Sequence, residues 1–169
     1  MLFHFWSDSE GTISENNTII NCDRGIMYGL DGSLHHGGII RNNMIHVTVD
    51  VGIYLCYAQG AKVYNNTVFT ESDYSNSIEY RFEQTINCQI VNNLTNKAIA
   101  NRNSANAYVE NNVTNALADW FVNASVADLH LSKNIESVID KAVDLEEITE
   151  DYDRESRPAG TSDIGADEK

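Results

Sequence analysis

Pairs of adjacent asparagines recur five times along the chain, and each pair lies between short apolar segments. The pairs are Asn16-Asn17, Asn42-Asn43, Asn65-Asn66, Asn92-Asn93 and Asn111-Asn112. The intervals between successive pairs are 26, 23, 27 and 19 residues. A period of roughly 20 to 50 residues indicates a repeat architecture in which each repeat stacks on its neighbours. The sequence therefore predicts a stack of about five repeats.

Apolar and polar residues alternate on both sides of the pairs. An apolar residue stands two positions before four of the pairs, and an aliphatic residue or threonine stands two positions after each pair. This period-2 alternation is typical of β-strands. A second strand-like segment follows each of the first four pairs: GIMY at 25–28, GIYL at 52–55, SIEY at 77–80 and AIA at 98–100. Such a repeat is too short for a propeller blade and lacks a leucine ladder, so it favours a parallel β-helix.

The asparagine pairs are interpreted as the corners of the coils. Stacked strands lie about 4.8 Å apart, so equivalent side-chain amides in successive coils can hydrogen-bond into a ladder. Asparagine also tolerates the left-handed backbone of a tight corner. We expect one asparagine of each pair to turn inward and form the ladder: Asn17, Asn43, Asn66, Asn93 and Asn112. Several paired asparagines also begin N-x-[ST] sequons, but the periodicity accounts for them without glycosylation.

The charge balance excludes several classes of partner. The chain has 25 Asp and Glu against 11 Lys and Arg, a formal net charge of -14. Nucleic acid needs clustered cations, and an anionic membrane surface repels an acidic protein, so we expect neither partner. An anionic polysaccharide is compatible only if a divalent cation bridges the two or if one face is locally basic.

Export and membrane signals are not visible in the sequence. No run of 18 apolar residues is present, so no transmembrane helix is predicted. The start MLFHFWSDSE lacks the basic and long apolar regions of a secretory signal, which leaves localisation open. Cys22, Cys56 and Cys88 are odd in number and far apart, so no disulfide framework is expected.

Residues 37–69, GGIIRNNMIHVTVDVGIYLCYAQGAKVYNNTVF, resemble two consecutive repeats of bacterial right-handed parallel β-helix proteins of the pectate-lyase-like superfamily. The tail DYDRESRPAGTSDIGADE (151–168) resembles the closing segment of many such proteins, although Glu155 stands near a position where that pattern has a glycine. The resemblance implies that the chain is similar to the C-terminal part of a longer member, and that relatives are often secreted. It implies no particular chemistry, because the superfamily includes lyases, hydrolases, epimerases and binding proteins.

The repeats and the resemblance together define the expected fold. We expect an all-β, single-stranded, right-handed parallel β-helix of about five coils over residues 10–125, preceded by a short N-terminal segment. Residues 126–169 should form a C-terminal extension that packs over the end or side of the helix, with a short helical turn at 137–143. An open coil end exposes backbone donors and apolar core. We therefore expect MLFHFWS (1–7) to fold over that end, or two such ends to meet in a homodimer.

The outward side of the second strand in each coil is the candidate functional face. Alternation predicts that Tyr54, Glu79 and Arg81 point outward in adjacent rows. His35 and His36 lie on a neighbouring turn. Further outward or turn residues are expected to complete a substrate-binding surface: Tyr57, Arg41 and Tyr64.

Two kinds of catalysis are chemically compatible with this face. A polysaccharide lyase needs a base beside the uronate carboxylate and a cation that neutralises that carboxylate. His35, His36 or a tyrosine would be the base, and Arg81 or Arg41 the cation. A glycoside hydrolase needs paired carboxylates, and Glu79 has no acidic neighbour close in register. The simpler interpretation is a surface ion pair between Glu79 and Arg81 and two histidines that fill a turn.

The acidic tail offers hard oxygen ligands that suit calcium. The candidate ligands form two groups: Asp151, Asp153 and Glu155, and Asp163, Asp167 and Glu168. No glycine-punctuated twelve-residue loop is present. The favoured alternative is therefore a structural strap, DIGADE (163–168), held to the last coil by Arg154 or Arg157. No other cofactor is implied.

Three functions are compatible with the sequence. The favoured one is a carbohydrate-binding or surface-interaction β-helix without catalysis, because candidate site residues are sparse. The second is a polysaccharide lyase or glycoside hydrolase, or the remnant of one. The third is a structural scaffold for assembly. Whether the chain is an enzyme, and which polysaccharide it meets, are left open.

Overall fold

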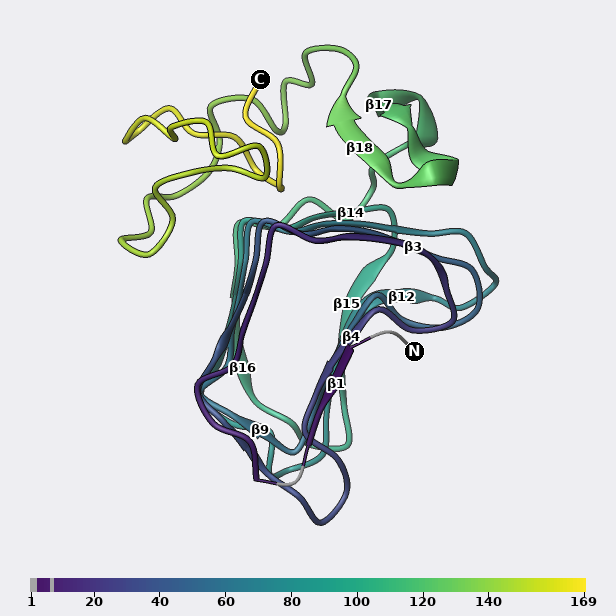
Figure 1. Ribbon diagram of the computed structural model, residues 1–169, viewed down its shortest axis with the longest axis vertical. Helices are drawn as coiled ribbons and strands as arrows, with labels where there is room; N and C mark the ends of the chain where they lie inside the picture. The colour runs from purple at the N-terminus through teal and green to yellow at the C-terminus, as the bar shows by residue number, and fades with distance from the viewer. Residues whose placement is uncertain (1–2, 7) are drawn as a thin grey trace.

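The computed structural model describes residues 3–6 and 8–169 and shows a parallel β-helix of about five turns (Figure 1). Each turn passes through three parallel sheets, named here sheets 1, 2 and 3 in chain order. In Figure 1 the chain runs from sheet 1 on the left, over sheet 2 at the top, to sheet 3 on the right, clockwise as it recedes from the viewer. This sense makes the helix right-handed and confirms the expected fold class.

The strands of the three sheets are short. Sheet 1 contains β2 (Ile13–Glu15), β6 (Ile39–Arg41), β10 (Lys62–Tyr64), β13 (Cys88–Val91) and β16 (Ala107–Glu110). Sheet 2 contains β3 (Thr18–Cys22), β7 (Met44–Val47), β11 (Thr67–Thr70) and β14 (Leu94–Thr95). Sheet 3 contains β1 (Phe3–Phe5), β4 (Ile26–Tyr28), β8 (Ile53–Cys56), β12 (Asn76–Arg81) and β15 (Ala98–Arg102). A parallel pair, β5 (His35–His36) and β9 (Ala58–Gln59), closes the fourth side.

Equivalent residues of successive coils stand in register and build the core. In sheet 1, Val63 pairs with Ile40 on one side and with Ile90 on the other. In sheet 3, Ile78 pairs with Ile53, as predicted from the alternation. All of these side chains are fully buried in one continuous core. Burial of these aliphatic side chains stabilises the stack of coils by about 25 cal/mol per Å² of apolar surface removed from water.

The two asparagines of each pair have different roles. The first has a left-handed backbone in every coil, with φ between 48° and 57°, and forms the corner between sheets 1 and 2. The second points inward, and these residues form the ladder predicted from the sequence. The rungs run from Asn17 to Asn43 (Nδ2 to Oδ1, 2.8 Å), from Asn43 to Asn66 (2.8 Å), from Asn66 to Asn93 (3.0 Å) and from Asn93 to Asn112 (2.9 Å).

The ladder also satisfies backbone groups at the corner. The Oδ1 atom of Asn66 accepts the backbone N–H of Asn43 at 3.1 Å. The Nδ2 atom of Asn66 lies 2.9 Å from the carbonyl oxygen of Ile40 and 3.1 Å from that of Tyr64. Since a buried polar group without a partner costs about 1–3 kcal/mol, one amide per coil removes several such costs at once.

The extension packs on the side of the β-helix rather than over its end. It begins with η1 (Ala118–Trp120), β17 (Phe121–Asn123), η2 (Ala124–Val126) and β18 (Asp128–Leu131). Strands β17 and β18 form an antiparallel pair, so residues 121–125 belong with the extension and not, as expected, with the last coil. Phe121 and Leu129 pack against Met44 and Leu94 on the outward face of sheet 2. The short helix expected at 137–143 does not form; a hydrogen-bonded turn closed by the Ile139 N–H and the Ile135 carbonyl lies slightly earlier in the chain.

The first asparagine of each pair holds the extension to the corner. Asn111 donates to the carbonyl of Lys141 (2.7 Å), Asn92 to Val143 (2.8 Å), Asn42 to Glu150 (2.7 Å) and Asn16 to Tyr152 (2.7 Å). Residues 141–152 therefore run along the corner from the last coil back to the first. None of the helices in residues 3–6 and 8–169 has the length and apolar character needed to cross a membrane.

The ladder makes a testable prediction about stability. Asn66→Ala removes a fully buried amide from the middle of the ladder and leaves donors and acceptors in two neighbouring coils unpaired. We expect a loss of about 3 kcal/mol or more in the free energy of unfolding, measured by urea denaturation. Asn17→Ala at the half-exposed end of the ladder is the matched control and should cost about 1 kcal/mol. Equal losses for the two variants would contradict the proposed role of the ladder.

Candidate functional site

The outward row of sheet 3 is not the open groove that the sequence suggested. Tyr54 and Glu79 do point away from the core, as predicted, but they are only 6% and 2% exposed. Side chains from neighbouring turns cover this row: Leu30, Tyr57, Tyr74 and Phe82. The prediction of direction is confirmed, and the expectation of an exposed Tyr54 and Glu79 is wrong because the turns are long enough to fold over the sheet.

Glu79 is held by a closed set of partners. Its carboxylate accepts hydrogen bonds from the hydroxyl of Tyr74 at 2.5 Å and from the amide of Asn76 at 2.9 Å. Arg102, one coil further on, supplies the positive charge at 3.3 Å. The expected ion pair between Glu79 and Arg81 does not form. With these partners the carboxylate is a structural group rather than a free acid or base.

Tyr54 is likewise unsuited to act as a base. Burial, and the neighbouring Cys56 thiol, raise the pKa of Tyr54 to about 12. The guanidinium carbon of Arg24 lies 4.6 Å from the centre of the Tyr54 ring, and Arg24 also forms an ion pair with Asp50. Tyr54 is therefore a neutral phenol enclosed beneath a cation, which stabilises the turn above it.

At the edge of this cover lies a half-exposed group of three side chains, Tyr57, Arg81 and Phe82, which we name the aromatic ledge. The rings of Tyr57 and Phe82 belong to successive coils, with centroids 5.2 Å apart and planes inclined by 45°. The guanidinium carbon of Arg81 lies 4.6 Å from the Phe82 ring centre. The Nε of Arg81 donates to Asn103 at 2.6 Å, which fixes the plane of the guanidinium. Tyr57 and Arg81 were predicted from the sequence, whereas Phe82 was not.

The backbone of the ledge is in an unusual conformation. Arg81 pairs with Cys56 and with Arg102, so the residues that follow them, Tyr57, Phe82 and Asn103, form one column. All three have positive φ, at 57°, 72° and 51°. This left-handed conformation suits asparagine but costs a bulky residue about 1–2 kcal/mol. Strained residues of this kind cluster at functional sites. The sequence carries no comparable signal for Phe82, because the aligned positions are Tyr57, Phe82 and Asn103 and share no residue type.

The two candidate histidines have opposite environments. His35 points into the core, is 0% exposed, and stacks on Tyr28 with ring centroids 4.1 Å apart. Its Nε2 is 2.9 Å from the hydroxyl of Thr12. The structure therefore corrects the expectation that His35 could serve as a base on the outer face. His36 follows it in β5 and is exposed.

Arg41 and Tyr64 lie on sheet 1 and not beside the ledge. Arg41 forms an ion pair with Glu15 and donates to the carbonyl of Glu147 in the extension. Tyr64 is 2% exposed and donates its hydroxyl to Gln89 at 2.6 Å. Neither residue is available together with Arg81 for one ligand, because their strands belong to different sheets.

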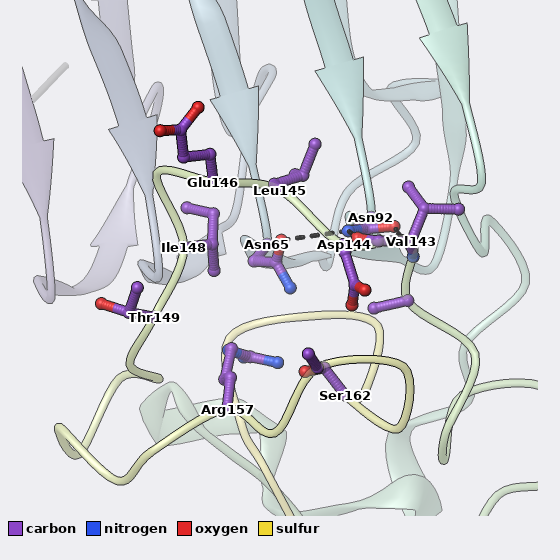
Figure 2. Close-up of a pocket in the computed structure, with 12 residues that line it drawn as sticks. Asn65, Asn92, Val143, Asp144, Leu145, Glu146, Ile148, Thr149, Arg157 and Ser162 are labelled. Atoms are coloured by element: carbon purple, nitrogen blue, oxygen red, sulfur yellow. Dashed lines mark hydrogen bonds between the residues drawn. The ribbon is translucent and has the colours of Figure 1, made fainter.

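A cavity of about 230 Å³ lies between the corner and the extension (Figure 2). Asn65 and Asn92 line it from the β-helix and are linked by a hydrogen bond of 3.3 Å. Arg157 and Ser162 line it from the opposite side. The Arg157 side chain is 1% exposed and donates to the carbonyls of Asp163 and Gly165 and to Glu168, so the cavity wall is built by the strap.

The strap alternative for the acidic tail is supported, with Arg157 rather than Arg154 as its anchor. The strap lies on the middle coils instead of the last one, because Gly165 donates to the carbonyl of Asn92. Gly165 has φ of 104°, and a Cβ there would stand 2.8 Å from the Thr67 hydroxyl, so this contact requires glycine.

The carboxylates of the two expected calcium groups do not stay together in the structure. Asp151 accepts the backbone N–H groups of Glu155 and Glu168, and Asp163 accepts those of Asp140 and Lys169. These carboxylates hold turns and do not converge on a cation. Two others meet a histidine that sequence reading overlooked: His130, Asp153 and Asp167 have ligand atoms within 4.8 Å of one another.

Comparisons with protein-family models, with curated proteins and with solved structures give no match. The site is therefore interpreted from its own geometry.

The buried histidine makes the stability of the protein depend on pH. Burial lowers the pKa of His35 to about 4, whereas in the unfolded chain it is near 6.5. Above pH 6.5 both states are neutral and stability is unaffected. Between pH 6.5 and 4 the unfolded state binds the proton more strongly, so about 2–3 kcal/mol of stability is lost as the pH falls.

His35→Phe keeps the stacking on Tyr28 and removes the titrating group. The difference in unfolding free energy between wild type and His35→Phe should therefore change by about 2–3 kcal/mol between pH 7 and pH 4, in favour of the variant at low pH. His36→Phe, at the exposed neighbour, is the control and should show no such change. A pH-independent difference for His35→Phe would show that His35 is not buried in its neutral form.

Proposed function

We propose that this protein is a carbohydrate-binding β-helix of the pectate-lyase-like kind that acts without catalysis and binds its glycan on the aromatic ledge. The observation that carries the proposal is the left-handed backbone at both Tyr57 and Phe82. Each residue holds an aromatic ring in successive coils at a conformational cost of about 1–2 kcal/mol. The same strained backbone conformation occurs at two aromatic residues of one column. A binding function for the two rings would explain why this strain is retained.

The chemistry of the ledge fits a sugar chain. The apolar faces of sugar rings stack on aromatic side chains, and planar polar groups beside them bind the hydroxyls. Arg81 supplies a fixed donor plane next to Phe82. The neighbouring Asp31 carboxylate raises the pKa of the Tyr57 hydroxyl, which keeps that hydroxyl neutral.

The charged groups around the aromatic ledge also fit the binding of an acidic glycan. Arg24, Arg81 and Arg102 belong to sheet 3 or to the turns over it, in a chain with only 11 lysines and arginines in total. Arg102 is neutralised by Glu79 and Arg24 by Asp50. Arg81 contacts an amide and a ring instead of a carboxylate. It is therefore the group that would meet a uronate or a sulfate on the glycan.

The positions of most candidate groups support the proposal that the protein acts without catalysis. A lyase needs a base and a cation within reach of one carbon atom, and a hydrolase needs two free carboxylates. His35 is inside the core, Tyr54 is buried with a raised pKa, and Glu79 is fully hydrogen-bonded. A lyase reaction remains the alternative, and it would appear as new ultraviolet absorbance of unsaturated products.

A scaffold function is favoured by one separate observation. In the last coil Val109 is 41% exposed, although it pairs with Ile90, which is fully buried. The extension covers the side of the helix and leaves this edge strand open. At the other end Phe3 and Phe5 pack against the core, while residues 1–2 and 7 of the expected cap lie outside the described residues. Contact between two copies through these ends is our second proposal.

The binding proposal predicts that affinity and stability respond differently to one substitution. Phe82→Asn introduces asparagine, the residue that already stands at the equivalent position of the next coil, Asn103. We expect binding to weaken by about tenfold or more, because a stacking surface is lost. We expect stability to fall by no more than about 1 kcal/mol, because the backbone strain is relieved.

The measurement is isothermal titration with polygalacturonate, alginate, chondroitin sulfate and a neutral β-glucan, combined with thermal unfolding of each variant. Tyr108→Asn, at an aromatic residue that is 56% exposed on β16, is the control and should bind as the wild type does. Failure of the wild type to bind any of the four glycans, or equal binding by Phe82→Asn, would refute the proposal.

The scaffold proposal has its own test. Val109→Lys adds a charge to the open edge strand, which opposes edge-to-edge pairing. If copies associate through this end, sedimentation velocity should show a wild-type dimer that the variant converts to a monomer. A monomeric wild type at the highest accessible concentration would exclude this contact.

A further inference from the structure

Three segments that are distant in sequence meet at one point of the extension. They are strand β18, the turn after Tyr152, and the strap 163–168. They contribute His130, Asp153 and Asp167, whose ligand atoms all lie within 4.8 Å of one another. In Figure 1 β18 and the C-terminal end lie on the same side of the molecule, above sheet 2. The cluster is thus formed only by the folded extension.

The orientation of His130 is fixed from behind by a carboxylate. Its Nδ1 lies 2.6 Å from Oδ1 of Asp128, which is two residues earlier on the same face of β18. A hydrogen bond from Nδ1–H to Asp128 assigns the proton to that nitrogen and directs Nε2 toward the cluster, where it lies 2.9 Å from Oδ2 of Asp153. Histidines that bind metals typically donate their second ring nitrogen to a carboxylate in this way.

Asp167 brings a largely buried carboxylate to the cluster. It is only 8% exposed. Its Oδ2 accepts the backbone N–H of Leu131 at 2.7 Å, and its Oδ1 makes no hydrogen bond within the described part of the chain. This second oxygen is not one of the buried atoms without a partner, so solvent and an ion can reach it. The single cationic group among these side chains would be a protonated His130, which Asp128 and Asp153 already share.

We propose that His130 Nε2 and the carboxylates of Asp153 and Asp167 bind a divalent first-row transition metal ion, with Asp128 as the residue that orients His130. One imidazole nitrogen with two carboxylate oxygens suits Zn²⁺ and its neighbours in the series. It does not suit Ca²⁺, which prefers six to eight oxygen ligands. The remaining coordination positions would be filled by water, since Asp153 lies at the surface.

The ion would join the three segments to one another. His130 belongs to the hairpin that packs on sheet 2, and Asp167 belongs to the strap that contacts the middle coils. Asp153 follows Tyr152, whose backbone carbonyl binds Asn16 of the first coil. Bound metal would therefore stabilise the attachment of the whole extension. This inference concerns the extension and is independent of glycan binding at the ledge.

The test uses the full-length, untagged chain freed of metal with a chelator and then titrated separately with ZnCl₂, MnCl₂ and CaCl₂ in a calorimeter. We expect one equivalent of Zn²⁺ to bind, with weaker binding of Mn²⁺ and Ca²⁺. Saturating Zn²⁺ should raise the melting temperature by about 4 °C or more. Replacing Zn²⁺ with Co²⁺ should give visible d–d absorption bands typical of nitrogen and oxygen ligands.

Substitutions locate the ion. Asp153→Asn removes a ligand at the surface, so it should fold normally and weaken Zn²⁺ binding at least tenfold. Asp128→Asn should weaken it by about tenfold through the loss of histidine orientation. His36→Gln, at an exposed histidine elsewhere, is the matched control and should bind as the wild type does. The proposal is overturned if Zn²⁺ does not bind, if Asp153→Asn binds it unchanged, or if Ca²⁺ binds more tightly than Zn²⁺.

Discussion

The hydrogen bond between asparagine amides of successive coils is the interaction on which this structure depends. A parallel β-helix must turn a sharp corner in every coil, and each corner leaves backbone groups that the sheets cannot pair. The amide of Asn66 satisfies the coil before it, its own coil and the coil after it. Because each amide both donates and accepts along the axis, the ladder is a continuous hydrogen-bonded chain through the interior, where the low dielectric strengthens every rung.

The neighbouring asparagine of each pair extends this order to the outside. Asn42 lies at the left-handed corner and binds the carbonyl of Glu150. Residues 141–152 thus bind the first asparagine of four pairs, and Asp163 binds that of the fifth, Asn65. The extension is therefore aligned with the repeats of the β-helix. A two-residue motif therefore determines both how the coils stack and where the last part of the chain lies.

How far the sequence predicts this structure depends on the range of the interactions. The ladder was predictable because its signal is local and repeated: Asn43 and Asn66 occupy the same place in each repeat. The outer role of Asn42 was not, because its partner is 108 residues away and has no repeat of its own. The inward direction of His35 was hidden because β5 has only two residues, too few to show an alternation.

For the candidate sites too, local features were predictable from the sequence and long-range contacts were not. Alternation placed Tyr54 and Glu79 on the outside of sheet 3 correctly, but the turns that cover them could not be inferred from strand periodicity. The sequence signal for the metal cluster was the spacing of Asp128 and His130, which puts both side chains on one face of a strand, and its other members lie in remote segments. Local patterns thus predicted the scaffold, whereas both proposed sites arise from contacts between turns or segments that only the folded chain brings together.

Hydrogen exchange of the asparagine side-chain amides, followed residue by residue by NMR, tests the central claim most directly. If the inner amides form a continuous ladder, the Nδ2 protons of Asn43, Asn66 and Asn93 should exchange only through global unfolding of the β-helix. The Nδ2 protons of Asn42 and Asn92 should exchange faster, through local detachment of the extension. Inner amides that exchange as fast as the outer ones would contradict the claim that the ladder is the interaction on which the fold depends.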